Sequence, residues 1–521
     1  MKATELDVAI AGGGLAGSLL ARQLQRALPE LHIGLFEKAT TRSFKVGESI
    51  VELGSHYCVR RQGLSRYLYE KHLPKNGLRY FFDDEARNTS LFDMSEIGTT
   101  NLPFHPAFHV DRARLEEDLL RMNCAAGIHV RLDTRVREVE LGEAGARHRL
   151  AVEERGKRET YSARWFVDAT GRNGLLARQL GLRARESEHR IGSVWGRFEG
   201  VADVDDMGPE SFRARIRYTS RSISTMHLWY PHYWIWFIPL RGGLTSIGVV
   251  GRPATERREL RSAEGLRAFL AEHRAAQQLL ANAKNVDVGS YVTIAYGTRR
   301  FFHPDRWAVI GEAAQAADPL YSPGIDFIAL ENDFVSDLVQ RDVSGADAEG
   351  VRERCELYEQ FMQFRHEATL LLYRGLYGGL GSYDLMRLKW DFDLGCYYNL
   401  WVSPYMQNQY TDLRFLRRQL RQKPFILQAL RNFADLFRAT ETALRERGAY
   451  YRNNLGLFSC GIENIDFVET VGMPRNRKQI LEDLERLFNS VRARAVALLK
   501  GSNEPVAPLP LSAFMGDRSL V

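Results

Sequence analysis

The feature that most restricts the fold of this chain is a glycine-rich turn close to its start, Gly12-Gly13-Gly14-Leu15-Ala16-Gly17. The apolar segment Asp7–Ala11 precedes the turn and has the length of a short strand. Ser18–Leu28 follows, with leucines at helical spacing. A second apolar segment, His32–Phe36, ends at Glu37. A strand, a GxGxxG turn, a helix and a second strand in this order predict a βαβ unit at the start of an α/β fold.

The spacing of the glycines in this turn is typical of Rossmann-type dinucleotide-binding domains. Gly12 permits the tight turn, Gly14 allows the backbone to approach a pyrophosphate, and Gly17 allows the helix to pack on the strand. Leu15 and Ala16 lie where the helix begins, and there unpaired N–H groups and the helix dipole favour phosphate. We therefore expect these five residues to bind the cofactor.

Glu37 lies 20 residues beyond Gly17, at the distance where a carboxylate bonds the ribose hydroxyls of a dinucleotide. The glycine motif and this acid leave both NAD and FAD open as the ligand. A glycine-rich turn that binds no ligand is the alternative interpretation.

Two later segments resemble motifs of the FAD-dependent monooxygenase superfamily and thereby indicate FAD. Asp168-Ala169-Thr170-Gly171-Arg172 resembles its second glycine motif, and Gly311-Glu312-Ala313-Ala314 resembles its Gly-Asp motif. In the family the acid of the Gly-Asp motif binds the ribityl chain, and Glu312 keeps that acceptor one methylene further out. Arg112 resembles the family arginine near the flavin phosphates, with a solvated arginine at a helix start as the alternative. No second complete dinucleotide fingerprint occurs, so we expect a partner flavin reductase to supply reduced FAD.

Three further segments, in matching order over the first two thirds of the chain, resemble the flavin-dependent halogenases. Lys45-Val46-Gly47-Glu48-Ser49 resembles the Gly-Glu-Ser turn that this family places beside the flavin, which implies flavin contacts for Lys45, Glu48 and Ser49. Trp234-Ile235-Trp236-Phe237-Ile238-Pro239 carries the WxWxIP signature, which implies that the indoles of Trp234 and Trp236 lie beside the flavin. An aromatic strand that only fills the core is the alternative.

Lys75, in Pro74-Lys75-Asn76-Gly77, lies 27 residues beyond Glu48. Halogenases place a lysine at a similar distance, before an aromatic-glycine pair, whereas Asn76 stands in the aromatic position here. The resemblance implies a flavin hydroperoxide that reacts with halide to give hypohalous acid. Lys75 would then direct this acid, either through a hydrogen bond or as a haloamine. A surface lysine next to Lys71 is the alternative.

The segment from Asp318 to Ile325 resembles the flavin and halide loop of the halogenases, with Gly324 and Ile325 toward the flavin. Ser322 and the N–H of Gly324 are the halide ligands that this loop offers, because Pro323 has no N–H. Indole-directed members carry Glu at the position of Tyr321, so the resemblance favours a phenol or a pyrrole.

We therefore expect an FADH2-dependent halogenase of an electron-rich aromatic compound, using chloride or bromide. Proline at position 323 is more typical of hydroxylating relatives. An FAD-dependent monooxygenase or oxidase is therefore the first alternative, and a non-catalytic flavoprotein subunit is the second.

The pattern along the chain predicts an α/β fold, α+β overall, in three parts. Residues 1–330 would form the FAD-binding domain, with a substrate-side β-sheet inserted at about 190–300. Residues 331–503 have helical periodicity and match no family motif, and the aromatic residues Tyr397, Tyr398 and Trp401 would line a pocket or fill the core. Residues 504–521 contain three prolines, and we expect a flexible tail there.

The composition excludes some classes of function. The net charge of +6, from 71 basic and 65 acidic side chains, is too small to indicate nucleic-acid binding. Five cysteines without a CxxC pair predict neither disulfides nor a metal site, which fits a cytoplasmic protein. No apolar run has the length of a transmembrane helix. The basic segment Arg414–Arg421 would be a solvated face or a docking surface for a carrier protein that presents the substrate.

Overall fold

The glycine turn joins β1 (Thr4–Ala11) to α1 (Leu15–Ala27) in a computed structural model that describes residues 4–143, 145–460, 466–517 and 519–521. β1 is central in a sheet whose strand order is β20-β21-β11-β1-β2-β8. It pairs in parallel with β2 (Ile33–Phe36) on one side and with β11 (Lys157–Asp168) on the other. The second half of β1 is apolar and buried on both faces, as in central parallel strands generally. The remaining strands of this sheet are β8 (His129–Arg131), β9 (Thr134–Glu140), β10 (His148–Glu154), β20 (Phe302–His303) and β21 (Trp307–Val309).

A second, mainly antiparallel sheet has the strand order β17-β13-β16-β15-β14-β5-β6-β22, with β18 paired to β13. Its centre is a hairpin formed by β15 (Tyr233–Pro239) and β16 (Leu244–Gly251). The flanking strands are β5 (Leu78–Phe82), β6 (Ser95–Ile97), β13 (Gly192–Glu199), β14 (Thr225–Tyr230), β17 (Lys284–Asn285), β18 (Gly289–Tyr291) and β22 (Phe458–Ser459).

The sequence pattern suggests a second sheet within residues 190–300, but the observed sheet also includes strands from outside this range. β5 comes from the first hundred residues and pairs in parallel with β14, while β22 comes from the C-terminal region and pairs in parallel with β6. Both additions are short strands whose partners are remote in sequence, so periodicity along the chain does not reveal the pairing.

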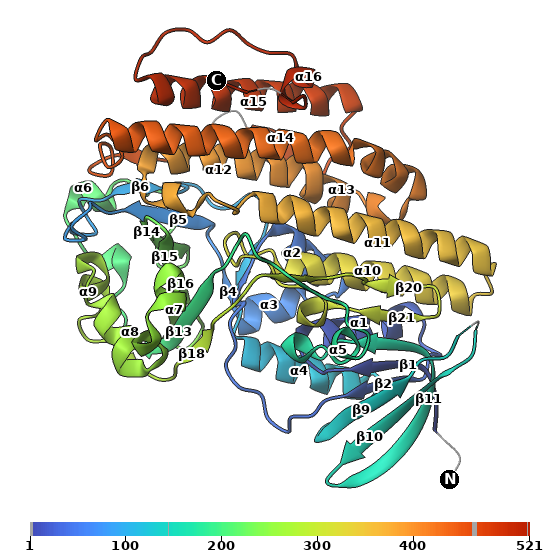
Figure 1. Ribbon diagram of the computed structural model, residues 1–521. Coiled ribbons are helices and arrows are strands. Elements are labelled where there is room, and N and C mark those ends of the chain that lie inside the picture. Colours follow the sequence, from blue (N-terminus) through green and yellow to red (C-terminus); the bar gives the residue numbers. More distant parts are fainter. Residues whose placement is uncertain (1–3, 144, 461–465, 518) are drawn as a thin grey trace.

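Helices of the C-terminal region form a layer that runs past both sheets, as Figure 1 shows. The long helices of this layer are α11 (Ala348–Leu371), α12 (Tyr383–Tyr397), α14 (Leu413–Glu446) and α15 (Arg477–Lys500). α10 (Gly324–Val343) precedes them, starts directly after the Tyr321–Pro323 loop and packs against α1. The α/β fold class is confirmed, and α10 connects the dinucleotide sheet to the helical layer.

The last residues do not form the flexible tail that the sequence predicts. The short helix α16 (Leu511–Phe514) places Phe514 fully inside the core, stacked on Phe433 at 5.7 Å between ring centroids. The side-chain amide of Asn432 donates to the carbonyls of Phe514 (3.0 Å) and Gly516 (2.7 Å). One aromatic anchor and backbone contacts hold this segment, and neither creates a periodic sequence pattern.

The shorter elements around the two sheets include α2 (Glu52–His56), α3 (Ser65–Lys71), α4 (Arg112–Ala125), α5 (Leu175–Gln179), β3 (Ser49–Ile50), β4 (Leu73–Pro74), β7 (Phe108–His109), and the pair β12 (Arg183–Arg185) and β19 (Tyr296–Thr298). Four short helices lie beside the second sheet: α6 (Glu210–Arg213), α7 (Arg252–Glu256), α8 (Ala263–Leu270) and α9 (Arg274–Leu280). The short helix α13 (Ser403–Met406) belongs to the C-terminal helical layer. Among the helices of the described residues, none combines the length and the hydropathy that crossing a bilayer requires.

Candidate functional site

The three motif glycines of the first turn differ in what surrounds them. A Cβ at Gly12 would lie 2.1 Å from the carbonyl oxygen of Ala169, and a Cβ at Gly17 would lie 2.0 Å from the carbonyl oxygen of Gly12. A Cβ at Gly14 would meet nothing within 4 Å. Gly12 and Gly17 are therefore needed for the packing of strand, helix and neighbouring loop, whereas Gly14 faces open space where α1 begins.

This open space fits the diphosphate of a dinucleotide. α1 starts at Leu15 with no side-chain cap, so its first N–H groups have no protein acceptor from a capping residue. Glu37 lies beside the turn, where its Oε2 accepts a hydrogen bond from the Gly13 N–H at 2.7 Å and its Oε1 accepts one from Ala39 at 2.9 Å. Donors for phosphate and an acceptor for ribose are thus present at one end of β1 and β2.

We expect Gly14→Val to abolish FAD binding without unfolding the protein. Gly14 has φ −73°, which valine tolerates, and the added atoms would occupy the space left for the diphosphate. FAD fluorescence titration measures the loss, and the thermal midpoint without FAD should stay at the wild-type value. In Gly17→Val, by contrast, the midpoint should fall as well because the new side chain collides with backbone. Equal FAD affinity in wild type and Gly14→Val would contradict the assignment.

The second and third flavin motifs meet the first one in space. Gly311 follows β21 with φ +59°, and a Cβ there would lie 2.8 Å from the Cβ of Ala16 in α1. Glu312 is next to it, half exposed, with Arg172 at 3.7 Å. The carboxylate of Asp168 is buried and accepts hydrogen bonds from its own loop, from Thr170 and from the Leu176 N–H (2.7 Å). Asp168 thus shapes the turn from within, while Glu312 is open to a ligand.

The Gly-Glu-Ser turn is held by charged residues that the sequence motifs do not include. Lys45, expected beside the flavin, and Arg112, expected near the flavin phosphates, pair with the buried carboxylate of Glu116 at 2.7 Å and 2.5 Å. Arg197 on β13 is fully buried, and its guanidinium pairs with Glu48 at 2.7 Å. Burial raises the pKa of Glu48 to about 7, although Arg197 acts in the opposite direction. Glu116 and Arg197 have no sequence signal, because ion-pair partners remote in sequence leave no spacing pattern.

Lys75 is buried, with 2% of its surface exposed, and is not a surface lysine. Its Nζ donates to the Oγ of Ser49, the serine of the Gly-Glu-Ser turn, at 2.8 Å. Burial lowers the pKa of Lys75 to about 8, against the pull of the nearby carboxylates of Glu52 and Asp326. One N–H of Lys75 is thus engaged by the flavin-side turn, and the remaining amine hydrogens are available to a bound reactant.

A buried polar chain continues from Lys75 through Ser49. The hydroxyls of Ser49 and Thr225 lie 3.3 Å apart, and the Thr225 hydroxyl lies 2.7 Å from Nε2 of His109. Burial lowers the pKa of His109 well below its ordinary value, with the Lys75 charge acting in the same direction. The ring is therefore neutral, and each hydroxyl can accept one bond and donate the next. This chain fixes the position of the Lys75 amine.

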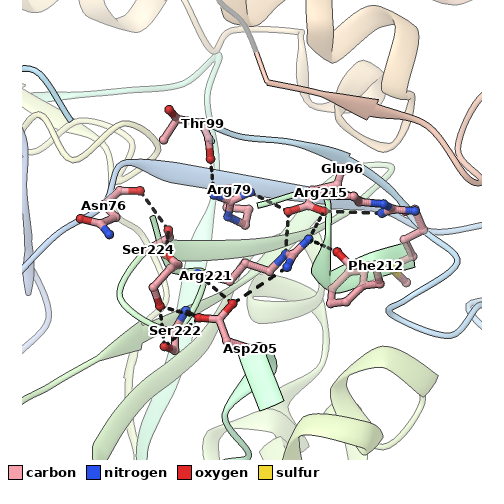
Figure 2. Close-up of polar contacts among 12 residues, drawn as sticks. Asn76, Arg79, Glu96, Thr99, Asp205, Phe212, Arg215, Arg221, Ser222 and Ser224 are labelled. Atoms are coloured by element: carbon pink, nitrogen blue, oxygen red, sulfur yellow. Dashed lines mark hydrogen bonds and ion pairs between the residues drawn. The ribbon is translucent and has the colours of Figure 1, made fainter. Parts of the chain in front are cut away.

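A buried ion cluster centred on Glu96 supports the segment that contains Lys75, and Figure 2 shows the cluster. Glu96 accepts a bond from Arg79 at 2.6 Å and two from Arg221 at 2.9 Å and 3.0 Å, and Arg215 lies 3.5 Å away. Arg79 also donates to the carbonyl of Thr99 at 2.7 Å. The cluster thereby ties β5 and β6 to the loop that follows β6.

The Lys75 segment is joined to the same region by two further bonds. The N–H of Asn76 donates to the carbonyl of Ile223 at 3.0 Å, and the Ser224 hydroxyl donates to the carbonyl of Asn76 at 2.9 Å (Figure 2). Ser224 lies close to Arg221 in sequence, so the ion cluster and the lysine segment share one short loop.

The WxWxIP tryptophans lie in an aromatic layer between the second sheet and the helices. Trp234 donates to the Tyr377 hydroxyl at 3.1 Å, and Tyr377 donates to Asp318 at 2.5 Å, at the base of the predicted halide loop. Trp236 donates to the Ser246 hydroxyl at 3.2 Å. Neither indole is among the described residues that line the cavity beside Lys75. The structure therefore places Trp234 as a support of the loop through Tyr377, a residue that no sequence motif includes.

The loop before α10 has an unusual backbone. Tyr321 and Ser322 both have positive φ, +66° and +56°, a conformation that costs non-glycine residues roughly 1–3 kcal/mol. Asp318 accepts from the Leu320 N–H at 2.8 Å, and Tyr373 donates to the Leu320 carbonyl at 2.8 Å. These buried bonds hold the strained loop in place.

The halide ligands predicted for this loop are only partly available. The Ser322 N–H donates to the Pro319 carbonyl at 2.9 Å, which leaves the Ser322 hydroxyl. Gly324 is the first residue of α10, where N–H groups have no intrahelical partner, and a Cβ there would meet nothing within 4 Å. Ile325 follows and packs close to Gly54. The Gly324 N–H is thus a backbone donor that this loop offers to an anion.

Lys75 borders a cavity of about 330 Å³. Lys75, the start of β5 and the strained loop form one part of its wall, and the Thr99–Ala107 segment forms another. α11 and α12 close the cavity on the side of the helical layer. Tyr397, Tyr398 and Trp401 line the cavity and also pack against the hydrophobic core. The volume suits a small aromatic molecule.

Comparisons with known proteins agree with this geometry. A family model described as FAD binding domain matches residues 5–326. The chain is 27% identical to the flavin-dependent halogenase chlA of Dictyostelium discoideum over 431 residues, which cover 77% of this chain and 70% of that protein. It is 26% identical to the 1H-pyrrole-2-carbonyl-(peptidyl-carrier protein) chlorinase of Pseudomonas fluorescens over 356 residues, 63% of this chain and 74% of that protein. The crystal structure of halogenase PltM in complex with phloroglucinol and FAD has a TM-score of 0.69 at 18% identity, over 94% of this chain and 96% of that one.

Proposed function

Because the chain belongs to the FAD binding domain family, we propose from that premise that it is an FADH2-dependent halogenase of an electron-rich aromatic compound, a phenol or a pyrrole. The prediction of FAD as cofactor is confirmed, and halogenases among its relatives favour this function over the monooxygenase or oxidase alternative. The observation that carries the proposal is the buried Lys75, bonded to the Gly-Glu-Ser turn and open to the cavity.

The chemistry of the proposal divides between the cofactor and the chain. Bound reduced FAD, with O2 and chloride or bromide, supplies hypohalous acid. The chain holds the diphosphate at α1 and Glu37, and offers the Gly324 N–H to an anion. Lys75 then donates to the hypohalous acid and orients its halogen toward the cavity, fixed by Ser49.

Two partners belong to the proposal. One is a flavin reductase, since the sequence contains one dinucleotide fingerprint. The other is the aromatic substrate, free or tethered to a carrier protein as the name of the Pseudomonas relative states for that enzyme. A cytoplasmic location fits the cysteines of the described chain, which are free thiols and mostly buried.

Product mass spectrometry tests the proposed function. The purified protein is supplied with FAD, a separate NADH-dependent flavin reductase and O2, with or without bromide, and with a panel of phenols and pyrroles. We expect products in which bromine replaces hydrogen, only when bromide and the reductase are both present. Products that gain one oxygen with or without bromide would establish the monooxygenase instead. Rapid NADPH oxidation by the protein alone would contradict the need for a reductase.

A further inference from the structure

Arg365 is a buried cation in the wall of the cavity, and no carboxylate in the described part of the chain forms a direct ion pair with it. It lies on α11 with 3% of its surface exposed, and it lines the cavity together with Ala368 and Thr369, one helical turn further on. No carboxylate of the described residues lies within 4.0 Å of its guanidinium, although the buried arginines Arg79, Arg197 and Arg221 all have such partners.

The contacts of Arg365 leave part of its hydrogen-bonding capacity unused. One Nη donates to the Thr369 hydroxyl, and the guanidinium lies 4.4 Å from the ring centroid of Trp401 and 5.3 Å from that of Phe327. Its Nε is buried without a hydrogen-bond partner among the described residues. The two rings fix the plane of the guanidinium, but they do not neutralise its charge.

Two carboxylates of the cavity wall, Asp326 and Asp393, are already engaged by other residues. Asp326, the carboxylate nearest in effect to Arg365, accepts bonds from the Gly54 N–H at 2.9 Å and from Tyr397 at 3.0 Å. Asp393 pairs with Lys389 at 2.5 Å. An unpaired charge in a desolvated place is unfavourable unless a ligand supplies the counter-charge. An anion bound in the cavity would therefore give the Arg365 guanidinium the direct ion-pair partner that the described residues do not provide.

We propose that Arg365 binds an ionised oxygen on the aromatic ring of the substrate, a phenolate or a ring carboxylate. The inference rests on the proposed function and specifies its substrate class. For a phenol, binding by Arg365 also activates the ring toward the electrophilic halogen, because a phenolate ring is a better nucleophile than the neutral phenol. The halogen passes from hypohalous acid to a ring carbon: the carbon–halogen bond forms, the oxygen–halogen bond breaks, and the released hydroxide takes the ring proton as water.

Binding of three nitroaromatic probes to the FAD-loaded protein tests the proposal without turnover. 4-Nitrophenol reports its own ionisation, because only the phenolate absorbs visible light. 4-Nitroanisole is its methyl ether without an ionisable oxygen, and 4-nitrobenzoate carries a carboxylate. At a slightly acidic pH we expect wild-type protein to bind 4-nitrophenol as the phenolate, or 4-nitrobenzoate if the anion is a carboxylate, and to bind 4-nitroanisole more weakly.

Arg365→Gln should weaken binding of the preferred anionic probe about tenfold or more and remove the phenolate absorbance. The affinity for 4-nitroanisole should stay within about twofold. Arg365→Lys keeps the charge and should retain part of the affinity. Arg352→Gln, an exposed position on the same helix, is the matched control and should change nothing.

Equal affinity of wild type and Arg365→Gln for both anionic probes would overturn the proposal. So would an equal loss for 4-nitroanisole, since that would mean Arg365 only shapes the cavity. If Arg365→Gln does not fold, Arg365→Lys decides the matter, because a weaker affinity for the anionic probe at unchanged 4-nitroanisole affinity assigns the contact to Arg365, whereas equal affinity for both probes would overturn it. These results do not depend on halogenation, so anion binding with no halogenated product would remove the proposed function and leave the role of Arg365 in place.

Discussion

Replacing Lys75 by alanine is expected to reduce halogenated product by a factor on the order of 10²–10⁴ while FAD binding stays at the wild-type level. Lys75 donates to Ser49 and opens onto the cavity, so its loss removes the group that would orient the electrophilic halogen. The cofactor contacts at α1 and Glu37 involve other residues and should not change. Product formation is measured by mass spectrometry, and FAD affinity by fluorescence.

The control for Lys75→Ala is Lys71→Ala, an exposed lysine at the end of α3. It changes the same charge nearby and should keep full activity. Peroxide release from the reduced cofactor should continue in Lys75→Ala, which separates loss of halogen transfer from loss of oxygen chemistry. Undiminished halogenation in Lys75→Ala would refute the role assigned to this residue.

Glu96→Gln is expected to lower the free energy of unfolding by about 3–5 kcal/mol, because it leaves buried arginines without their counter-charge. Arg79 and Arg221 are almost fully buried, and both bond Glu96 directly. Urea unfolding measures the change. Glu117→Gln, whose exposed side chain pairs with Arg121 on the surface, should cost less than about 0.5 kcal/mol.

The effect of Glu96→Gln should depend on pH in a defined direction. The arginines hold the pKa of Glu96 below its ordinary value, so the carboxylate stabilises the fold above the unfolded-state pKa and loses that effect as pH falls through the folded-state pKa. The difference between wild type and Glu96→Gln should therefore be full near neutral pH and shrink in acid. A difference that stays constant into acid would mean that the Glu96 charge contributes nothing.

The parts of this protein that follow from local sequence rules could be predicted. The packing of the turn requires glycine at Gly12 and Gly17, and the space for a diphosphate requires it at Gly14, and these requirements together fix the spacing. The hairpin of β15 and β16 consists of two largely apolar segments joined by Arg241-Gly242-Gly243, a sequence typical of a tight turn. The distance of Lys75 from the Gly-Glu-Ser turn predicts a lysine beside the flavin, and the structure buries Lys75 against that turn.

The parts that depend on remote contacts could not be predicted. Glu116 and Arg197 take part in the flavin-side turn only because the fold brings distant charges together. Arg365 lies within an ordinary helical pattern, and only the cavity distinguishes it from a surface arginine. Phe514 anchors the C-terminal segment as a single residue, too short a signal for periodicity.

The pairing of β6 with β22 has a consequence for how the polypeptide acquires its structure. The Leu457 N–H donates to the Ser95 hydroxyl across 362 residues of sequence, and Asn454 bonds the carbonyls of Asp83 and Gly381. During synthesis the edge of β6 therefore stays unpaired until most of the chain, including β22, has left the ribosome. High contact order slows folding, and an open strand edge invites pairing between copies. Versions of the chain that end before β22 leave this edge of β6 open and should therefore aggregate.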